Sequence, residues 1–411
     1  MNRQKVLQIV QKNLDSAVSL LMDIIRIPST RGQEIEISKY LKPHFEPLVD
    51  SVERIILPES IIRDPDYSFP VAGYKYNGEA NLRLFIKGSY DNKSIAFNTH
   101  VDVVPPSTGQ ANAFQPVFEN GKIFGRGAAD CKGQIVTLWL LVKTLHDLGI
   151  RPAGDVIIDL VVEEECGGNG SLLVVRNGLE VDAAIILEPT ELQVMHMIRG
   201  AVWFTVETSG KAGHSGSPGT TRSALKEAIE VMNQIEKVRK KMLTVSREQC
   251  PDLQNHPDPM PLTFGTLQAG NWPAATPDQA ILKGVFGFLP PFNRKDIQRE
   301  LTKAIGQDHA DIRFDMLNND YSFLEVEHPL VQDMLEAALK TKVASKPAFM
   351  NASCDAWRYS QQLNIPTIVF GGGSLSTAHS REEFIHSEEI GKAASVLINF
   401  IHKWSGLNDS I

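Results

Sequence analysis

Residues 155–168 read DVIIDLVVEEECGG, and this stretch decides which kind of fold to expect. Its first eight residues are largely apolar, which is the pattern of a strand that is buried on both faces of a parallel sheet. Three acids, Glu163, Glu164 and Glu165, follow directly, and two glycines come after Cys166. Acids at the end of a buried strand repel one another and resist desolvation, so we expect a cation beside them. A solvated acidic edge is the alternative, but glycines rather than lysines follow the acids.

Short apolar runs alternate with helical patterns around this stretch. Strands are predicted at residues 82–87, 94–104, 155–162 and 183–187, and helices at 1–23, 134–148 and 170–177. Such alternation predicts a mainly parallel sheet that is covered by helices on both faces. The alternation returns after about Ser322, with helices predicted at 331–341 and 387–404 and a strand at 367–370.

The pattern between these two parts is different. Residues 201–208 alternate apolar and polar side chains, and further strands are predicted at 281–289 and 311–315. A helix between them carries apolar residues at helical spacing, namely Leu225, Ile229, Met232 and Ile235. This predicts an antiparallel sheet with helices on one face. We therefore expect an α/β domain made of residues 1–198 and 319–411, interrupted by an inserted α+β domain of residues 199–318.

The composition excludes several classes of protein. The 411 residues exceed one ordinary domain, and 42% hydrophobic and 22% charged residues are typical of a globular protein. A net charge of −8 argues against broad binding to nucleic acid or anionic lipid, so we expect a small-molecule partner. No apolar run approaches the ~18 to 20 residues that cross a membrane, and no secretory segment is visible. Four scattered cysteines indicate reduced thiols, so we expect a cytoplasmic protein.

Candidate metal ligands also lie at the ends of other predicted strands. His100 and Asp102 are two residues apart, so their side chains point to the same side of the strand. A carboxylate beside a histidine can fix the tautomer that binds a metal. Glu188 follows the strand predicted at 183–187, and Pro189 stops its pairing. A lone histidine at a strand end is usually structural, but ligand sites in open α/β sheets lie beyond these strand ends.

Two glycine-rich segments carry the remaining candidates. Asp130 lies in the turn GRGAADCKG, residues 125–133, which opens a predicted helix. Capping of that helix would explain Asp130 but not the glycines, whereas a tightly held turn can aim one carboxylate at a metal. His379 ends the run GGGSLSTAH, residues 371–379. Phosphate binding is a rival interpretation of this loop, but no lysine and helix start follow in P-loop order.

Five segments carry these candidates, around residues 100, 130, 163–165, 188 and 379. Their residues and their order along the chain resemble the M20 family of metallopeptidases and amidohydrolases. The resemblance covers nearly the whole chain and extends to GKAGHSG, residues 210–216, which is similar to a histidine motif in that family's lid domain. It implies a zinc-peptidase-like catalytic domain with an inserted lid and dimerisation domain. It also implies a hydrolase that cleaves the amide bond of a small N-acyl amine or amino acid, as acetylornithine deacetylase does. An M20 dipeptidase or carboxypeptidase, or an inactive metal-binding or ligand-binding relative, is the alternative.

The resemblance implies a role for each candidate ligand. His100 and Glu188 would hold one zinc ion, Glu165 and His379 would hold a second, and Asp130 would bridge both. Such a set leaves positions open for water and substrate, as a catalytic site requires. Cobalt or manganese could occupy the same ligands.

The catalytic residues implied by the resemblance are Asp102, Glu164 and His214. Asp102 would orient the nearby histidine ligand, and Glu164 would move a proton from the attacking water to the leaving amine. His214 would donate to the developing oxyanion, and in this family it typically arrives from a second subunit. A homodimer through the inserted domain is therefore implied.

Two further expectations follow from the resemblance. Because three glutamates are consecutive, the alignment could slip by one residue, and Glu163 would then replace Glu164 as the general base. Family members often carry a cis peptide bond after the bridging aspartate, which predicts a cis bond between Asp130 and Cys131.

One part of the inserted domain departs from the family pattern. Many relatives have an asparagine three residues before a proline and an arginine in the next strand, and these hold a substrate carboxylate. Here Ala274 takes the asparagine position, and residues 284–290, GVFGFLP, contain no arginine. Asn271 could supply a shifted amide and Trp272 a flat apolar wall. We therefore expect a less acidic or an aromatic substrate, such as a small acylated amine.

Overall fold

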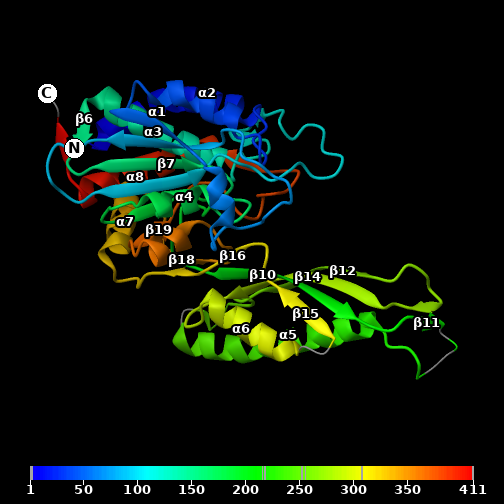
Figure 1. The fold of residues 1–411 in the computed structure, drawn as a ribbon. Coiled ribbons are helices and arrows are strands. Elements are labelled where there is room, and N and C mark those ends of the chain that lie inside the picture. The colour runs from blue at the N-terminus through cyan, green and yellow to red at the C-terminus, as the bar shows by residue number, and fades with distance from the viewer. Residues whose placement is uncertain are drawn as a thin grey trace.

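A computed structural model of the chain describes residues 3–214, 216, 219–250, 253–254, 256–306 and 309–409. The structure has two lobes, and each contains its own sheet and helices (Figure 1). The chain passes between them twice, between residues 198 and 200 and between residues 319 and 322. The larger lobe is built on a nine-stranded sheet and the smaller lobe on a five-stranded sheet. The predicted α/β fold with an inserted α+β part is confirmed.

The middle of the nine-stranded sheet is parallel. Its central strands are β7 (Val156–Val161), β3 (Ile95–His100), β8 (Ala184–Ile186) and β19 (Thr367–Val369). Antiparallel strands flank them, with β1 (Ser51–Ile56) and β2 (Ala80–Ile86) on one side and β9 (Val194–Ile198) and β17 (Ser322–Phe323) on the other. Strand β18 (Pro347–Met350) pairs with β9 in parallel. The carboxyl ends of the central strands therefore meet at one edge.

Both faces of this sheet are buried. Phe97 and Ile185 belong to a core that includes α1 (Arg3–Ile25), α3 (Lys132–Leu148), α7 (Pro329–Lys340) and α8 (Ser387–Trp404). Their neighbours Ala96 and Ile186 belong to a second core, which includes Val174 of α4 (Asn169–Asn177). Because successive side chains of a strand point to opposite faces and both faces are covered, most residues of the central strands are apolar.

The smaller lobe has an antiparallel sheet in the order β12 (Leu262–Ala269), β14 (Gln279–Phe288), β10 (Gly200–Ser209) and β15 (Ala310–Arg313), and β16 (Asn318–Asn319) also pairs with β10. Helices α5 (Ala224–Gln249) and α6 (Arg294–Ile305) pack on one face (Figure 1). Val202, Phe204 and Val206 alternate along β10 toward these helices. The strands of this sheet lie between Gly200 and Asn319, and we keep domain boundaries at 198/199 and 318/319 as a proposal.

Shorter elements complete the fold. They are helix α2 (Ile35–Phe45), the 3-10 helix Glu59–Arg63, the π-helix Arg358–Gln362, and the strands β4 (Val117–Glu119), β5 (Lys122–Phe124), β6 (Ile150–Pro152), β11 (Gly213–His214), β13 (Ala275–Thr276), β20 (Phe384–His386) and β21 (Leu407–Asp409). The strand predicted at 94–104 ends early at His100, because the backbone then leaves the sheet and the Val103 N–H donates to the Ser29 carbonyl. Among the helices of the described residues, none combines the length and the apolar character that spanning a membrane requires.

Candidate active site

The five predicted metal ligands lie together at the carboxyl edge of the nine-stranded sheet. His100 ends β3, Glu165 lies in the turn after β7, and Glu188 follows β8. Asp130 precedes α3, and His379 lies in the loop between β19 and β20. Their possible ligand atoms form two groups, in each of which all atoms lie within 4.8 Å of one another. Asp130 belongs to both groups, which is the arrangement expected of a bridging residue.

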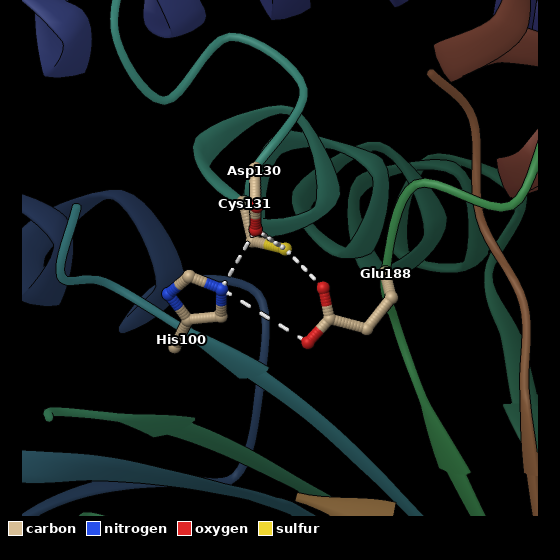
Figure 2. A group of neighbouring side chains, drawn as sticks. All are labelled: His100, Asp130, Cys131 and Glu188. Atoms are coloured by element: carbon tan, nitrogen blue, oxygen red, sulfur yellow. Dashed lines mark hydrogen bonds and ion pairs between the residues drawn. The ribbon is translucent and has the colours of Figure 1, made fainter. Parts of the chain in front are cut away.

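The first group is buried and contains His100, Asp130, Glu188 and also Cys131 (Figure 2). His100 Nε2 lies 3.1 Å from Asp130 Oδ1 and 4.0 Å from Glu188 Oε1. Cys131 Sγ lies 2.9 Å from Glu188 Oε2 and 3.2 Å from Asp130 Oδ1. The peptide bond between Asp130 and Cys131 is cis, so that expectation is confirmed. Sequence reasoning did not single out Cys131 as a site residue, and only its position beside Asp130 could have indicated it.

The second group is more open to solvent. His379 Nε2 lies 3.2 Å from Asp130 Oδ2 and 3.0 Å from Glu165 Oε1. The His379 side chain is 50% exposed, whereas that of His100 is 1% exposed. A substrate can therefore approach from the side of His379 and Glu165.

The charges in the two groups favour a cation beside them. Burial raises the pKa of Glu188 to about 8 and also raises the pKa of Glu165, because the ionised carboxylates lose water. The hydrogen bonds of His379 to Asp130 and Glu165 raise the pKa of its imidazole to about 10. Within the described ranges, no lysine or arginine forms an ion pair with these carboxylates. Imidazole nitrogens and largely buried carboxylate oxygens in these numbers fit divalent metal ions.

Asp102 holds the acidic turn that follows β7. Its Oδ1 accepts a hydrogen bond from the backbone N–H of Glu164 at 3.1 Å, and its Oδ2 accepts one from that of Glu165 at 3.0 Å. Asp102 also lies beside the predicted ligand His100, whose Nδ1 is 2.9 Å from the Asp102 carbonyl oxygen and 3.5 Å from Oδ1. The closer contact is therefore to the backbone. Asp102 connects the end of β3 with the turn after β7.

The three consecutive glutamates have different surroundings. The Glu163 carboxylate is buried and accepts hydrogen bonds from Arg31 Nε at 3.1 Å, Tyr76 Oη at 2.9 Å and Asn169 Nδ2 at 2.7 Å. Glu164 is partly exposed as a residue, and within the described part of the chain its carboxylate forms no hydrogen bond or ion pair. Burial nevertheless raises its pKa well above the ordinary value of a glutamate. Of the two, only Glu164 is free to exchange a proton with a substrate or water.

A buried ion pair supports both ligand groups and was not predicted from the sequence. Glu383 Oε2 lies 2.7 Å from an Arg126 guanidinium nitrogen, and the two side chains are 2% and 1% exposed. Glu383 Oε1 accepts hydrogen bonds from the backbone N–H groups of Ala129 and Asp130 at 3.1 and 3.2 Å. Arg126 donates to the carbonyl of His379 at 3.3 Å. The pair therefore ties the turn of Asp130 to the loop of His379.

Residues 96–403, which make up more than half of the chain, match the family model described as Peptidase family M20/M25/M40. The chain belongs to this family. An N-formyl-4-amino-5-aminomethyl-2-methylpyrimidine deformylase of Halalkalibacterium halodurans is 22% identical over 378 residues, which cover 81% of this chain and 84% of the relative. A probable succinyl-diaminopimelate desuccinylase of Staphylococcus aureus is 22% identical over 413 residues, which cover 92% and 96%. These relatives are amide-bond hydrolases, and the chain is a metal-dependent amidohydrolase of the M20 family.

Solved structures share the fold of this M20 chain. A dipeptidase of Saccharomyces cerevisiae has a TM-score of 0.77 at 14% identity, and the match covers 98% of both chains. A dinuclear metal-binding M20 peptidase of Bacillus subtilis has a TM-score of 0.60 at 15% identity, and the match covers 95% of this chain and 98% of the other. Dinuclear metal binding occurs in this family, and two ligand groups that share Asp130 are compatible with it.

The remaining predicted site residues lie elsewhere in this M20 chain. His214 is exposed in β11, which pairs with β13 at the end of the smaller lobe that points away from the nine-stranded sheet (Figure 1). Asn271 and Trp272 are exposed just before β13, and Trp272 is 69% exposed. One chain therefore does not bring these residues to the predicted metal ligands. Ser215, in the same motif as His214, lies outside the described residues.

Proposed function

We propose that the chain is a two-zinc deacylase that hydrolyses the amide bond of a small N-acyl amine or amino acid. The observation that carries this proposal is the pair of ligand groups that share Asp130, with the carboxylate of Glu164 next to them and unpartnered among the described residues. The ligands would be His100, Asp130 and Glu188 for one ion and Asp130, Glu165 and His379 for the other. Imidazole and carboxylate ligands suit zinc, and cobalt or manganese is compatible with them.

When bound, the two metal ions supply positive charge that acidifies a water molecule and polarises the amide carbonyl. Glu164 accepts the proton of the attacking water and delivers it to the nitrogen of the leaving amine. Its burial suits this role, because a carboxyl whose pKa is raised transfers protons efficiently near neutral pH. Asp102 keeps the Glu164 backbone fixed and so holds the base in place.

The smaller lobe supports the substrate class that we propose. Strand β14 contains no arginine, so the usual partner of a substrate carboxylate is missing from that position. Asn271 offers an amide and Trp272 an apolar wall. The deformylase among the relatives bears the name of an aromatic amine substrate without a carboxylate. We therefore favour an N-formyl or N-acetyl amine with a weakly acidic or aromatic body over an acidic amino acid.

The proposed enzyme is a homodimer in which each chain completes the site of the other. Strand β12 is an edge of the five-stranded sheet, and five of its eight residues are exposed while the other three are partly buried. Within the described residues nothing pairs with its outer edge, which leaves backbone groups available to a second copy. His214 would then reach the partner's site and donate to the oxyanion.

No disulfide bond joins the four cysteines, all of which lie within the described part of the chain, and this supports the proposed cytoplasmic location.

The experiment that tests the function measures the release of free amine from a panel of N-formyl, N-acetyl and N-succinyl amines and dipeptides. Chelator-treated protein is assayed with and without added zinc, and the Glu164→Gln variant serves as the matched control. Zinc-dependent release from an N-acyl amine supports the proposal. Release from dipeptides alone would instead identify a dipeptidase, and silence across the panel in protein that binds zinc would indicate an inactive relative.

A further inference from the structure

The thiol of Cys131 lies inside the first ligand group rather than beside it. Its Sγ atom, His100 Nε2 and oxygens of Asp130 and Glu188 all lie within 4.8 Å of one another (Figure 2). Cys131 is fully buried, as are the imidazole of His100 and nearly all of Glu188. The sulfur atom therefore has no contact with solvent and faces the two carboxylates of the group.

The three contacts of this sulfur atom limit the hydrogen bonds that its thiol can form. It lies 2.9 Å from Glu188 Oε2 and 3.2 Å from Asp130 Oδ1, and its third contact is the Leu187 carbonyl oxygen at 3.7 Å. When both carboxylates are ionised, all three neighbours are acceptors, and a thiol can satisfy only one of them as a donor. A cation between the sulfur and the carboxylates would interact favourably with all of these atoms.

The second ligand group contains no sulfur. It consists of Asp130, Glu165 and His379, and it lies on the more exposed side of the site. The first group therefore offers four protein atoms of three kinds, whereas the second offers three atoms and retains room for other ligands. In zinc proteins a complete set of protein ligands belongs to tightly held ions, and an open position belongs to catalytic ions.

We propose that Cys131 is a fourth ligand, as a thiolate, of the metal ion held by His100, Asp130 and Glu188. This inference rests on the proposed two-metal function. On binding, the S–H bond breaks, the sulfur electron pair forms the bond to the metal, and the proton leaves to solvent. Sulfur selects soft metals, so the first position prefers zinc or cadmium over manganese, while the second position shows little such preference. The two metal positions therefore differ in affinity and in the rate at which they exchange.

Cobalt(II) added to the chelator-treated full-length protein tests the assignment. Visible d–d absorption reports that cobalt is bound, and a near-ultraviolet thiolate-to-cobalt charge-transfer band reports a sulfur ligand. We expect the charge-transfer band to grow with the first equivalent of cobalt. It should disappear in Cys131→Ser and persist in Cys166→Ser, since Cys166 belongs to neither ligand group.

A second measurement does not depend on the spectra. In Cys131→Ser, the zinc affinity of the tighter position should fall at least ~10-fold. Removal of a residue that only hydrogen-bonds a metal ligand already lowers metal affinity by about 10- to 100-fold, so the loss of a direct ligand should be no smaller. Affinity of the weaker position should change little.

Each outcome distinguishes the inference from the proposed function. Cobalt bound with d–d bands but without a charge-transfer band in the unaltered protein would overturn the ligand role of Cys131, whose thiol would then only donate to Glu188. The two-metal function would survive that result. Failure to bind cobalt or zinc at all would overturn both. If Cys131→Ser does not fold, the charge-transfer band in the unaltered protein and in Cys166→Ser still tests whether a thiolate is a ligand.

Discussion

Glu383 is the residue whose replacement tests most directly how the fold holds the two ligand groups. Its carboxylate accepts one ion-pair contact from Arg126 and two hydrogen bonds from the backbone of Ala129 and Asp130. Replacement by glutamine keeps the shape and one acceptor oxygen but removes the negative charge. The backbone N–H groups can still be satisfied, whereas the buried guanidinium of Arg126 loses its counter-ion.

The expected magnitude follows from the burial of the pair. Removal of one partner from a buried ion pair lowers the free energy of unfolding by about 3 to 5 kcal/mol, because the other charge remains buried and unpaired. Both side chains are almost fully buried here, so solvent offers little compensation. Glu383→Gln retains an acceptor, which places the loss near 3 kcal/mol, at the low end of that range. Zinc affinity should fall about 10- to 100-fold, as it does when residues that orient metal ligands are replaced.

Two assays separate these effects. Urea unfolding of chelator-treated protein measures stability without metal, and competition with a chromophoric chelator measures zinc affinity of the folded protein. The matched control is Glu382→Gln, which alters an exposed neighbouring carboxylate and should change neither quantity. Unchanged zinc affinity in folded Glu383→Gln would refute the idea that the pair with Arg126 positions the ligands, even if stability falls as expected.

Three further predictions concern the proposed reaction. Glu164→Ala should retain bound zinc by metal analysis but lose at least ~100-fold of amine release, as expected on removal of a general base; full activity would transfer that role to Glu163. Inactive His214→Ala and Glu164→Ala chains, unfolded and refolded together, should recover roughly a quarter of the activity, because about half of the dimers are mixed and each has one complete site. No recovery would contradict a site shared between chains. Zinc at ~100 times its dissociation constant should stabilise chelator-treated protein by about 2.7 kcal/mol in urea unfolding, and equal stability with and without zinc would argue against metal binding by the folded state.

The positions of the five proposed ligands could be inferred from the sequence for a geometric reason. Parallel strands bring their carboxyl ends to one edge, so polar residues that follow apolar strands must lie near one another. His100 and Glu188 illustrate this, since each lies at or just beyond the end of a central strand. The partners of these residues could not be inferred in the same way. Arg126 and Glu383 are 257 residues apart in the chain, and no local pattern relates them.

Parts of the fold also escaped the sequence pattern. No helix was expected at α2, where Pro43 argues against one, yet the helix forms because Ile37, Leu41 and Phe45 are buried against the sheet. Tertiary burial outweighs local preference there. Strands β9, β17 and β18 were not predicted either, because they are short and their pairing depends on segments far apart in the chain.

The three consecutive glutamates after β7 show how one turn can give adjacent acids different chemistry. Glu163 adopts a φ of 59°, and its side chain enters the interior, where Arg31 balances its charge. Glu165 faces His379, so its charge is balanced by an imidazole or by the metal that the imidazole would share. Glu164, between them, has a fixed backbone but no partner for its carboxylate among the described residues, and burial raises its pKa. Charge is therefore compensated at the first and third positions, whereas the second carboxyl is desolvated without a partner among the described residues, and a general base needs the raised pKa that results.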